Sequence, residues 1–123
     1  MRTAKLTLNG QDHLLCFSAR LVRSCTERYG DVSNINEALS GDPMRSFDEA
    51  LWLLAEMMAA GDRYAKMMGL DNPPPLTADD LLDACDLNDF IGLKRKIAET
   101  ITSGQRTTVE VTPPKNAEAT QGA

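Results

Sequence analysis

The sequence predicts a mainly α (α+β) fold, a small helical domain of four to five helices with an N-terminal β-hairpin. Two short apolar runs flank Asn9-Gly10, a dipeptide typical of the type I′ turn in a two-residue hairpin. Apolar residues then recur at helical spacing as far as Ile101. The length of 123 residues fits one domain with a modest core. We expect a single globular domain over 1–111 and a disordered tail over 112–123. Within the domain, we expect a hairpin over 1–17, a helical part over 18–104 and a candidate third strand over 105–111.

The hairpin is the first element of the chain. A two-residue turn places Leu6 opposite His13. Because side chains alternate between the faces of a strand, one face is expected to carry the core side chains Ala4, Leu6, Leu8, Leu15 and Phe17. The opposite face holds Leu14 and Cys16, which predicts cover from a further element or another subunit. His13, the only histidine, is expected to face solvent or to pair across the strands, and not to act in catalysis.

Helix signals follow the hairpin in order. Ser18 is a predicted N-cap, and Gly30 ends the helix that it opens. A short helical piece is expected over Ser33–Leu39. The S-x-x-E sequence at Ser46–Glu49 matches a capping box, so the longest helix is expected to begin there and to end at about Met68.

Two further helices are expected after a rigid break. The break contains three consecutive prolines, which cannot continue a helix. Thr77 is a predicted N-cap with two aspartates in the favourable first turn. The last helix is expected to start at Asn88 or Asp89 and to end near Gly104. Arg106–Val111 has β propensity and is the candidate third strand of the sheet.

The long helix carries the residues that we predict to contact a protein partner. Trp52 falls near the middle of its polar arc, where it is either an exposed contact anchor or covered by the 33–39 segment or a chain terminus. Two methionine pairs could line an adaptable groove, and core filling is the alternative. The predicted interaction site comprises Phe47, Leu51, Trp52, Met57, Met58, Met67 and Met68.

Charge is distributed unevenly along the chain. Residues 1–30 hold five Lys or Arg and two acidic residues (+3), residues 31–90 hold three and thirteen (−10), and residues 91–123 hold five and three (+2), which sums to −5. This acidic balance argues against nucleic-acid binding through phosphate neutralisation. It favours contact with a basic protein partner or between copies of the chain.

Other functional classes lack their sequence signals. No apolar run approaches the ~20 residues of a membrane span, and no signal peptide is seen, which predicts a cytoplasmic protein without a membrane partner. The three cysteines form no C-x-x-C pair, so we expect reduced thiols and no metal site. There is neither a Gly-rich phosphate loop nor a catalytic constellation. The sequence therefore predicts a protein that is not an enzyme and needs no cofactor.

The order of several short strings resembles a known family. KLTLNG opens the chain, an amphipathic helix ends in Tyr29-Gly30, and EALWLLAEMMAAGDRYAKMMG forms an Ala/Leu-rich helix. A Pro-rich break with Leu76-Thr77, an acidic helix and a basic helix follow, and PPKNAEATQ lies close to the end. This pattern is similar to the tail assembly chaperones of long-tailed (siphovirus-type) bacteriophages and prophages, and it covers nearly the whole chain.

The resemblance implies a non-enzymatic role in the host bacterial cytoplasm. Such chaperones bind and solubilise the tape measure protein before the tail tube polymerises around it. Many are made in two lengths by a ribosomal frameshift, and the longer form is thought to recruit the tail tube protein. This chain would correspond to the short form. The alternative is a structural phage morphogenesis component, such as a head–tail connector subunit.

Overall fold

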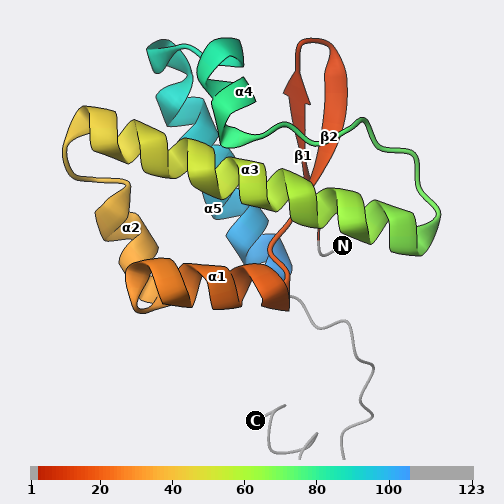
Figure 1. Ribbon diagram of the computed structural model, residues 1–123, viewed down its shortest axis with the longest axis horizontal. Coiled ribbons are helices and arrows are strands. Elements are labelled where there is room, and N and C mark those ends of the chain that lie inside the picture. The colour runs from red at the N-terminus through yellow and green to blue at the C-terminus, as the bar shows by residue number, and fades with distance from the viewer. Residues whose placement is uncertain (1–2, 106–123) are drawn as a thin grey trace, which may run out of the picture.

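The computed structural model describes residues 3–105 and confirms a mainly α-helical domain with an N-terminal hairpin (Figure 1). Its elements, in chain order, are β1 (Thr3–Leu8), β2 (Gln11–Cys16), α1 (Ala19–Tyr29), the 3-10 turn η1 (Val32–Asn34), α2 (Ile35–Ala38), α3 (Pro43–Met68), α4 (Ala78–Ala84), the 3-10 turn η2 (Leu87–Asp89) and α5 (Phe90–Gly104). The predicted strand over 106–111 and the predicted tail over 112–123 lie outside the described residues.

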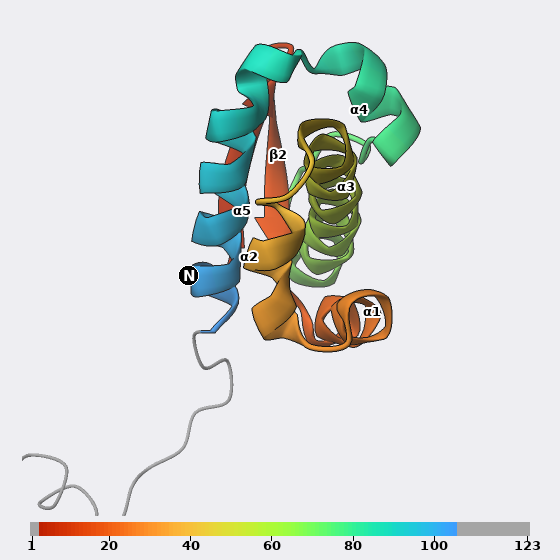
Figure 2. The same cartoon turned by 90° about the vertical axis from the view of Figure 1, so that its left-hand side faces the viewer.

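The long helix α3 crosses the whole domain, and the other elements pack around it. The hairpin and α4 lie above α3 in Figure 1, and α1 lies below it. Figure 2 looks nearly along α3 and shows α5 as a separate layer on one side. Contacts of α3 with β2, and of α5 with both strands and with α3, join these layers. The core therefore lies where α3, α5 and the hairpin meet.

The hairpin has the register that the sequence predicts. Asn9 and Gly10 both have positive φ, 51° and 77°, as a type I′ turn requires. Leu6 pairs with His13, and the expected core face is buried apart from a half-buried Leu8. On the other face Cys16 is buried and Leu14 is half-buried. Part of the predicted cover comes from the same chain. Helix α3 packs on β2, and Asn72 Oδ1 accepts the Leu14 N–H at 2.9 Å.

Gly61 is the point where α3 comes closest to the hairpin. A Cβ added to Gly61 would overlap the Leu14 carbonyl group and lie 3.0 Å from the Leu15 nitrogen. The neighbours here are backbone atoms, which cannot move aside as the end of a side chain can. Glycine in mid-helix is therefore needed for the close packing of α3 on β2.

Most of the predicted helix boundaries are confirmed. The Ser18 hydroxyl accepts the Leu21 N–H at 3.3 Å, and Gly30 ends α1 with φ 83°. The short helical piece expected over 33–39 corresponds to η1 and α2, which together cover 32–38. Thr77 and Asp80 form a reciprocal capping box at the start of α4.

The predicted start of α3 is wrong. The helix begins at Pro43, and the Asp42 carboxylate caps it by accepting the Arg45 N–H at 3.1 Å. Proline is favoured at the first helical position, because its φ already suits a helix and its missing N–H would have no partner there. Ser46 consequently lies inside α3, where its hydroxyl is buried and finds no hydrogen-bond partner among residues 3–105.

Of the two alternatives for His13, the structure supports cross-strand pairing and not solvent exposure. Its cross-strand pairing with Leu6 is confirmed, but solvent exposure is wrong, because only 2% of the residue is accessible. Its Nδ1 atom has no hydrogen-bond partner within the described part of the chain. Burial lowers the pKa of His13, and the nearby Asp12 carboxylate opposes this effect more weakly. The folded protein therefore favours a neutral imidazole.

The lowered pKa of His13 predicts a pH-dependent stability. In the unfolded chain a histidine titrates near pH 6.5. Between that pH and the lower folded-state pKa, the unfolded chain binds more protons, so the free energy of unfolding should fall as the pH decreases and level off below the folded-state pKa. Urea denaturation from about pH 7.5 to about pH 5 measures this slope. His13→Leu should flatten the slope, and an equally steep profile in the variant would contradict the assignment.

Candidate functional site

The structure divides the seven predicted interaction residues into three groups. Phe47, Leu51, Met57 and Met58 belong to the core, with at most 4% of each exposed. Leu51, Met57 and Met58 are enclosed by other side chains of the domain, so their assignment to a contact surface is wrong. Phe47 is also buried, but its ring lines a groove that is described below. Core filling, the alternative for the methionines, holds for Met57 and Met58. The apolar face of α3 is covered by other elements of the same domain.

Trp52 is half-buried and packs against the end of α1. The Arg28 guanidinium carbon lies 4.2 Å from the centroid of the Trp52 ring, and the Tyr29 ring meets the indole edge to face at 6.0 Å. Such cation–π and aromatic contacts stabilise the packing of two helices. Trp52 is therefore not a fully exposed anchor, and α1, an element that the sequence analysis did not consider as its cover, contacts its ring.

Glu49 joins the same helices by polar contacts. Its carboxylate accepts two hydrogen bonds from Arg28, at 2.8 and 3.0 Å, and one from the Tyr29 hydroxyl at 2.6 Å. These bonds, led by the Arg28 contact, hold the pKa of Glu49 below its usual value against the effect of burial. Burial and the Glu49 contact raise the pKa of Tyr29. The charges in this cluster satisfy one another, which is typical of a structural contact.

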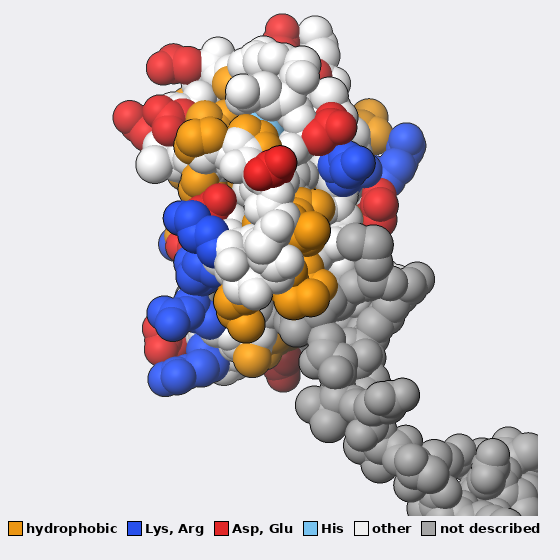
Figure 3. All heavy atoms as spheres, turned by 90° about the vertical axis from the view of Figure 1, so that its right-hand side faces the viewer, with side chains coloured by type: hydrophobic (Ala, Val, Ile, Leu, Met, Phe, Trp, Pro, Cys, Tyr) orange, Lys and Arg blue, Asp and Glu red, His pale blue; other side chains and the backbone are white. Residues whose placement is uncertain are grey.

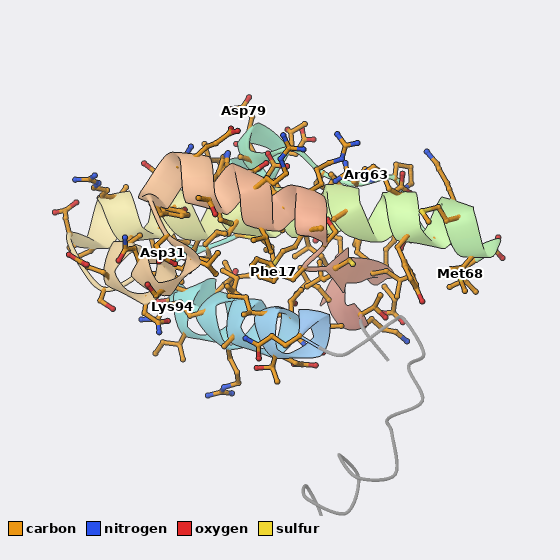
Figure 4. The ribbon with its side chains drawn as sticks, turned by 90° about the horizontal axis from the view of Figure 1, so that it is seen from below. Phe17, Asp31, Arg63, Met68, Asp79 and Lys94 are labelled. Carbon is orange, nitrogen blue, oxygen red and sulfur yellow. The ribbon has the colours of Figure 1, made fainter. Side chains whose placement is uncertain are left out.

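The second methionine pair is exposed at the end of α3. Met67 is 82% exposed and Met68 57%, and Leu70 follows at 47%. We call these three residues the α3-end patch. Figure 4 places Met68 at the tip of α3, and Figure 3, which faces this end, shows hydrophobic side chains at the surface. Among the predicted site residues, these two methionines have the most exposed side chains.

A groove that the sequence analysis did not identify lies between the first turns of α3 and the α4–η2 segment. Its volume is about 570 Å³. Three of its apolar side chains are large and exposed, Met44 at 58%, Leu82 at 50% and Leu87 at 58%. We call it the α3–α4 groove, and its lining residues are Met44, Phe47, Leu82, Asp83, Ala84, Cys85, Asp86, Leu87 and Asp89.

The rim of the α3–α4 groove is acidic. The stretch from residue 70 to residue 93 holds six aspartates and no lysine or arginine. Three of these aspartates, Asp83, Asp86 and Asp89, line the groove. Two of them also cap η2, because Asp86 accepts the Asn88 N–H and Asp89 accepts the Asp86 N–H. Capping leaves the charge in place, so the groove combines apolar walls with a negative rim.

A second cavity, of about 530 Å³, lies beside the Glu49 cluster. Its lining includes the paired side chains of Arg28, Tyr29 and Glu49, with α2 and the start of α3 on the other sides. Its principal polar groups already bond to one another, and none of the large exposed apolar side chains of residues 3–105 lies in its lining. We therefore take the α3–α4 groove and the α3-end patch as the candidate site.

Comparison of the chain with protein-family models, curated proteins and solved structures found no match. Within residues 3–105, no three His, Cys, Asp or Glu side chains are grouped so as to hold a metal ion. No helix in the same range has the length and apolar character needed to cross a membrane. The candidate site is therefore defined by its geometry and charge alone.

Proposed function

We propose that the protein is a non-enzymatic tail assembly chaperone, which binds and solubilises a phage tape measure protein in the host cytoplasm and helps tail tube polymerisation. The observation that carries the proposal is an exposed apolar groove with an acidic rim on a small helical domain. The resemblance of the ordered sequence strings to this family supports the same function.

The two exposed patches suit a chaperone that must bind and then release its partner. Exposed apolar patches on a small domain are typical of contact surfaces. A long helical partner can place the apolar face of a helix in a groove, and methionines adapt to varied side chains. Each patch exposes three large apolar side chains, so each contact would be weak and reversible. Complementary charge would increase the rate of encounter without requiring tight binding.

The proposal extends to two further partners. A longer form of the chain would recruit the tail tube protein, and self-association would allow several copies to cover one tape measure protein. Both partners follow from the resemblance and from the uneven charge of the sequence. A slippery nucleotide run near the stop codon, together with a following tape measure gene, is the expected genetic arrangement.

Co-expression tests the proposal directly. The tape measure protein of the same genome is expected to be mostly insoluble when produced alone in bacteria and to become soluble when this chain is produced with it. An unrelated aggregation-prone protein serves as the control and should gain no solubility. Equal solubility of the tape measure protein with and without the chain would contradict the proposal. Presence of the chain in purified virions would instead support a structural component.

A further inference from the structure

We infer that the α3–α4 groove docks a partner helix whose bulky apolar side chains are flanked by lysine or arginine. The inference deepens the proposed function and rests on it only in naming the tape measure protein as the source of that helix. The chemistry of the docking helix is inferred from the geometry and charge of the groove alone.

The apolar lining determines which side chains fit. Phe47 contributes a buried ring, which is held edge to face against Phe90 with 5.8 Å between centroids. Met44 and Leu82 provide exposed apolar side chains from α3 and α4, and Leu87 adds a third from η2. A volume of about 570 Å³ lies within the range of cavities that bind ligands, so more than one aliphatic side chain can enter. Side chains three or four residues apart on one helix face have the spacing to enter together.

The rim determines the charge of the partner. Asp83, Asp86 and Asp89 lie on the groove, and the ion pairs found in residues 3–105 involve none of them. Along the chain, the basic residue nearest to these aspartates is Lys94, whose ammonium lies 5.0 Å from the Phe90 ring centroid. Arg45 follows Met44 of the lining, and its charge acts on Glu49. Lysine or arginine beside the apolar side chains of a partner would neutralise this rim, whereas acidic residues would be repelled.

A second copy of the chain fits the groove less well. The α3-end patch is the exposed apolar segment that could insert, and Lys66 lies beside it. However, Lys66 already pairs with Asp62 at 3.1 Å, and Asp71 follows Leu70 directly. Insertion of the α3-end patch into the groove of another copy would therefore bring the negative charge of Asp71 to an acidic rim. Docking of a second copy is the competing outcome in the experiment below.

A synthetic helix is the probe for this inference. We would use a labelled peptide of about 16 residues, long enough to form a helix, with leucines at helical spacing and lysines beside them. Its binding to the full chain is followed by fluorescence anisotropy. Replacing the lysines by glutamate, or the leucines by alanine, should weaken binding about tenfold or more. Added salt should weaken binding as well. Equal binding of the basic and acidic peptides would overturn the inference.

Matched variants locate the binding. Asp83→Asn in the groove is compared with Asp79→Asn, which removes the same charge from the same helix at a side chain that points away from the domain (Figure 4). Leu87→Ser is compared with Ile91→Ser, which alters a 70% exposed side chain outside the groove lining. The two groove variants should weaken peptide binding several-fold and the two controls less than twofold. Equal losses in both sets would overturn the inference.

Cys85 provides an independent readout inside the groove. It is half-buried in the lining, while the other two cysteines of the chain are buried. The bound peptide should therefore slow alkylation of Cys85, and an unchanged rate would place the peptide elsewhere and overturn the inference. A self-association seen by light scattering that Leu87→Ser abolishes would assign the groove to a second copy and also overturn it.

The two proposals can fail separately. If the peptide does not bind but the tape measure protein is still solubilised, the groove inference is wrong and the proposed function stands. If the peptide binds at the groove but co-expression gives no solubilisation, the inference stands and the proposed function is wrong.

Discussion

Replacing Gly61 by alanine is expected to lower the free energy of unfolding by about 2 kcal/mol or more, although alanine is the better helix former by about 1 kcal/mol. The added methyl group would overlap the Leu14 carbonyl, so α3 must move away from β2. Such a shift loosens the packing between the longest helix and the hairpin, which are both part of the core. Urea denaturation with a two-state fit measures the loss.

Gly92→Ala is the matched control. Gly92 also lies in a helix, but a Cβ added there meets nothing within 4 Å. The same chemical change should therefore increase stability by about 0.5–1 kcal/mol through helix propensity and reduced freedom of the unfolded chain. If the two variants change stability in the same direction, close packing at Gly61 does not explain the presence of glycine there.

The features that could be predicted from sequence depend on short-range rules. Asn9-Gly10 determines a turn within four residues, and the turn then determines the whole register of the hairpin. Ser18 and Thr77 act as caps because their side chains reach amides only three residues away. The two competing starts of α3, at Asp42-Pro43 and at Ser46, show the limit of such rules, because both match a capping pattern and only one is used.

The candidate site could be predicted only in part, because it depends on contacts between distant segments. Helical spacing identifies an apolar stripe on α3 but not the elements that cover it, so buried and exposed methionines looked alike. Met44 and Leu82 line one groove although 38 positions separate them in the sequence (82 − 44). One local feature of the sequence does indicate the groove. It is the series of aspartates over 70–93 without a lysine or arginine, together with leucines that are exposed in the structure. Two of these aspartates cap η2, and the groove that they line exists only where α3 and the α4–η2 segment meet.

One methionine from each pair of α3 should respond to the same substitution with a very different loss of stability. Met58 is 1% exposed and belongs to the core, whereas Met67 is 82% exposed. Met58→Ala should lower the free energy of unfolding by about 2–5 kcal/mol, because it removes buried apolar contacts and leaves a cavity. Met67→Ala should change it by less than about 0.5 kcal/mol, as is usual for an exposed position. Both variants make the same chemical change, and a difference of this size exceeds what helix propensity can supply, so it reports burial.

The same pair of variants separates folding from partner binding. Met67→Ala keeps the fold, so any loss of tape measure solubilisation in that variant reports contact by the α3-end patch. A loss in Met58→Ala would report unfolding, because that side chain has no surface to offer a partner. Urea denaturation of both variants, measured beside the co-expression assay, makes the distinction. Equal stability of Met58→Ala and the unaltered protein would contradict the core position of Met58 and return it to the candidate contact surface.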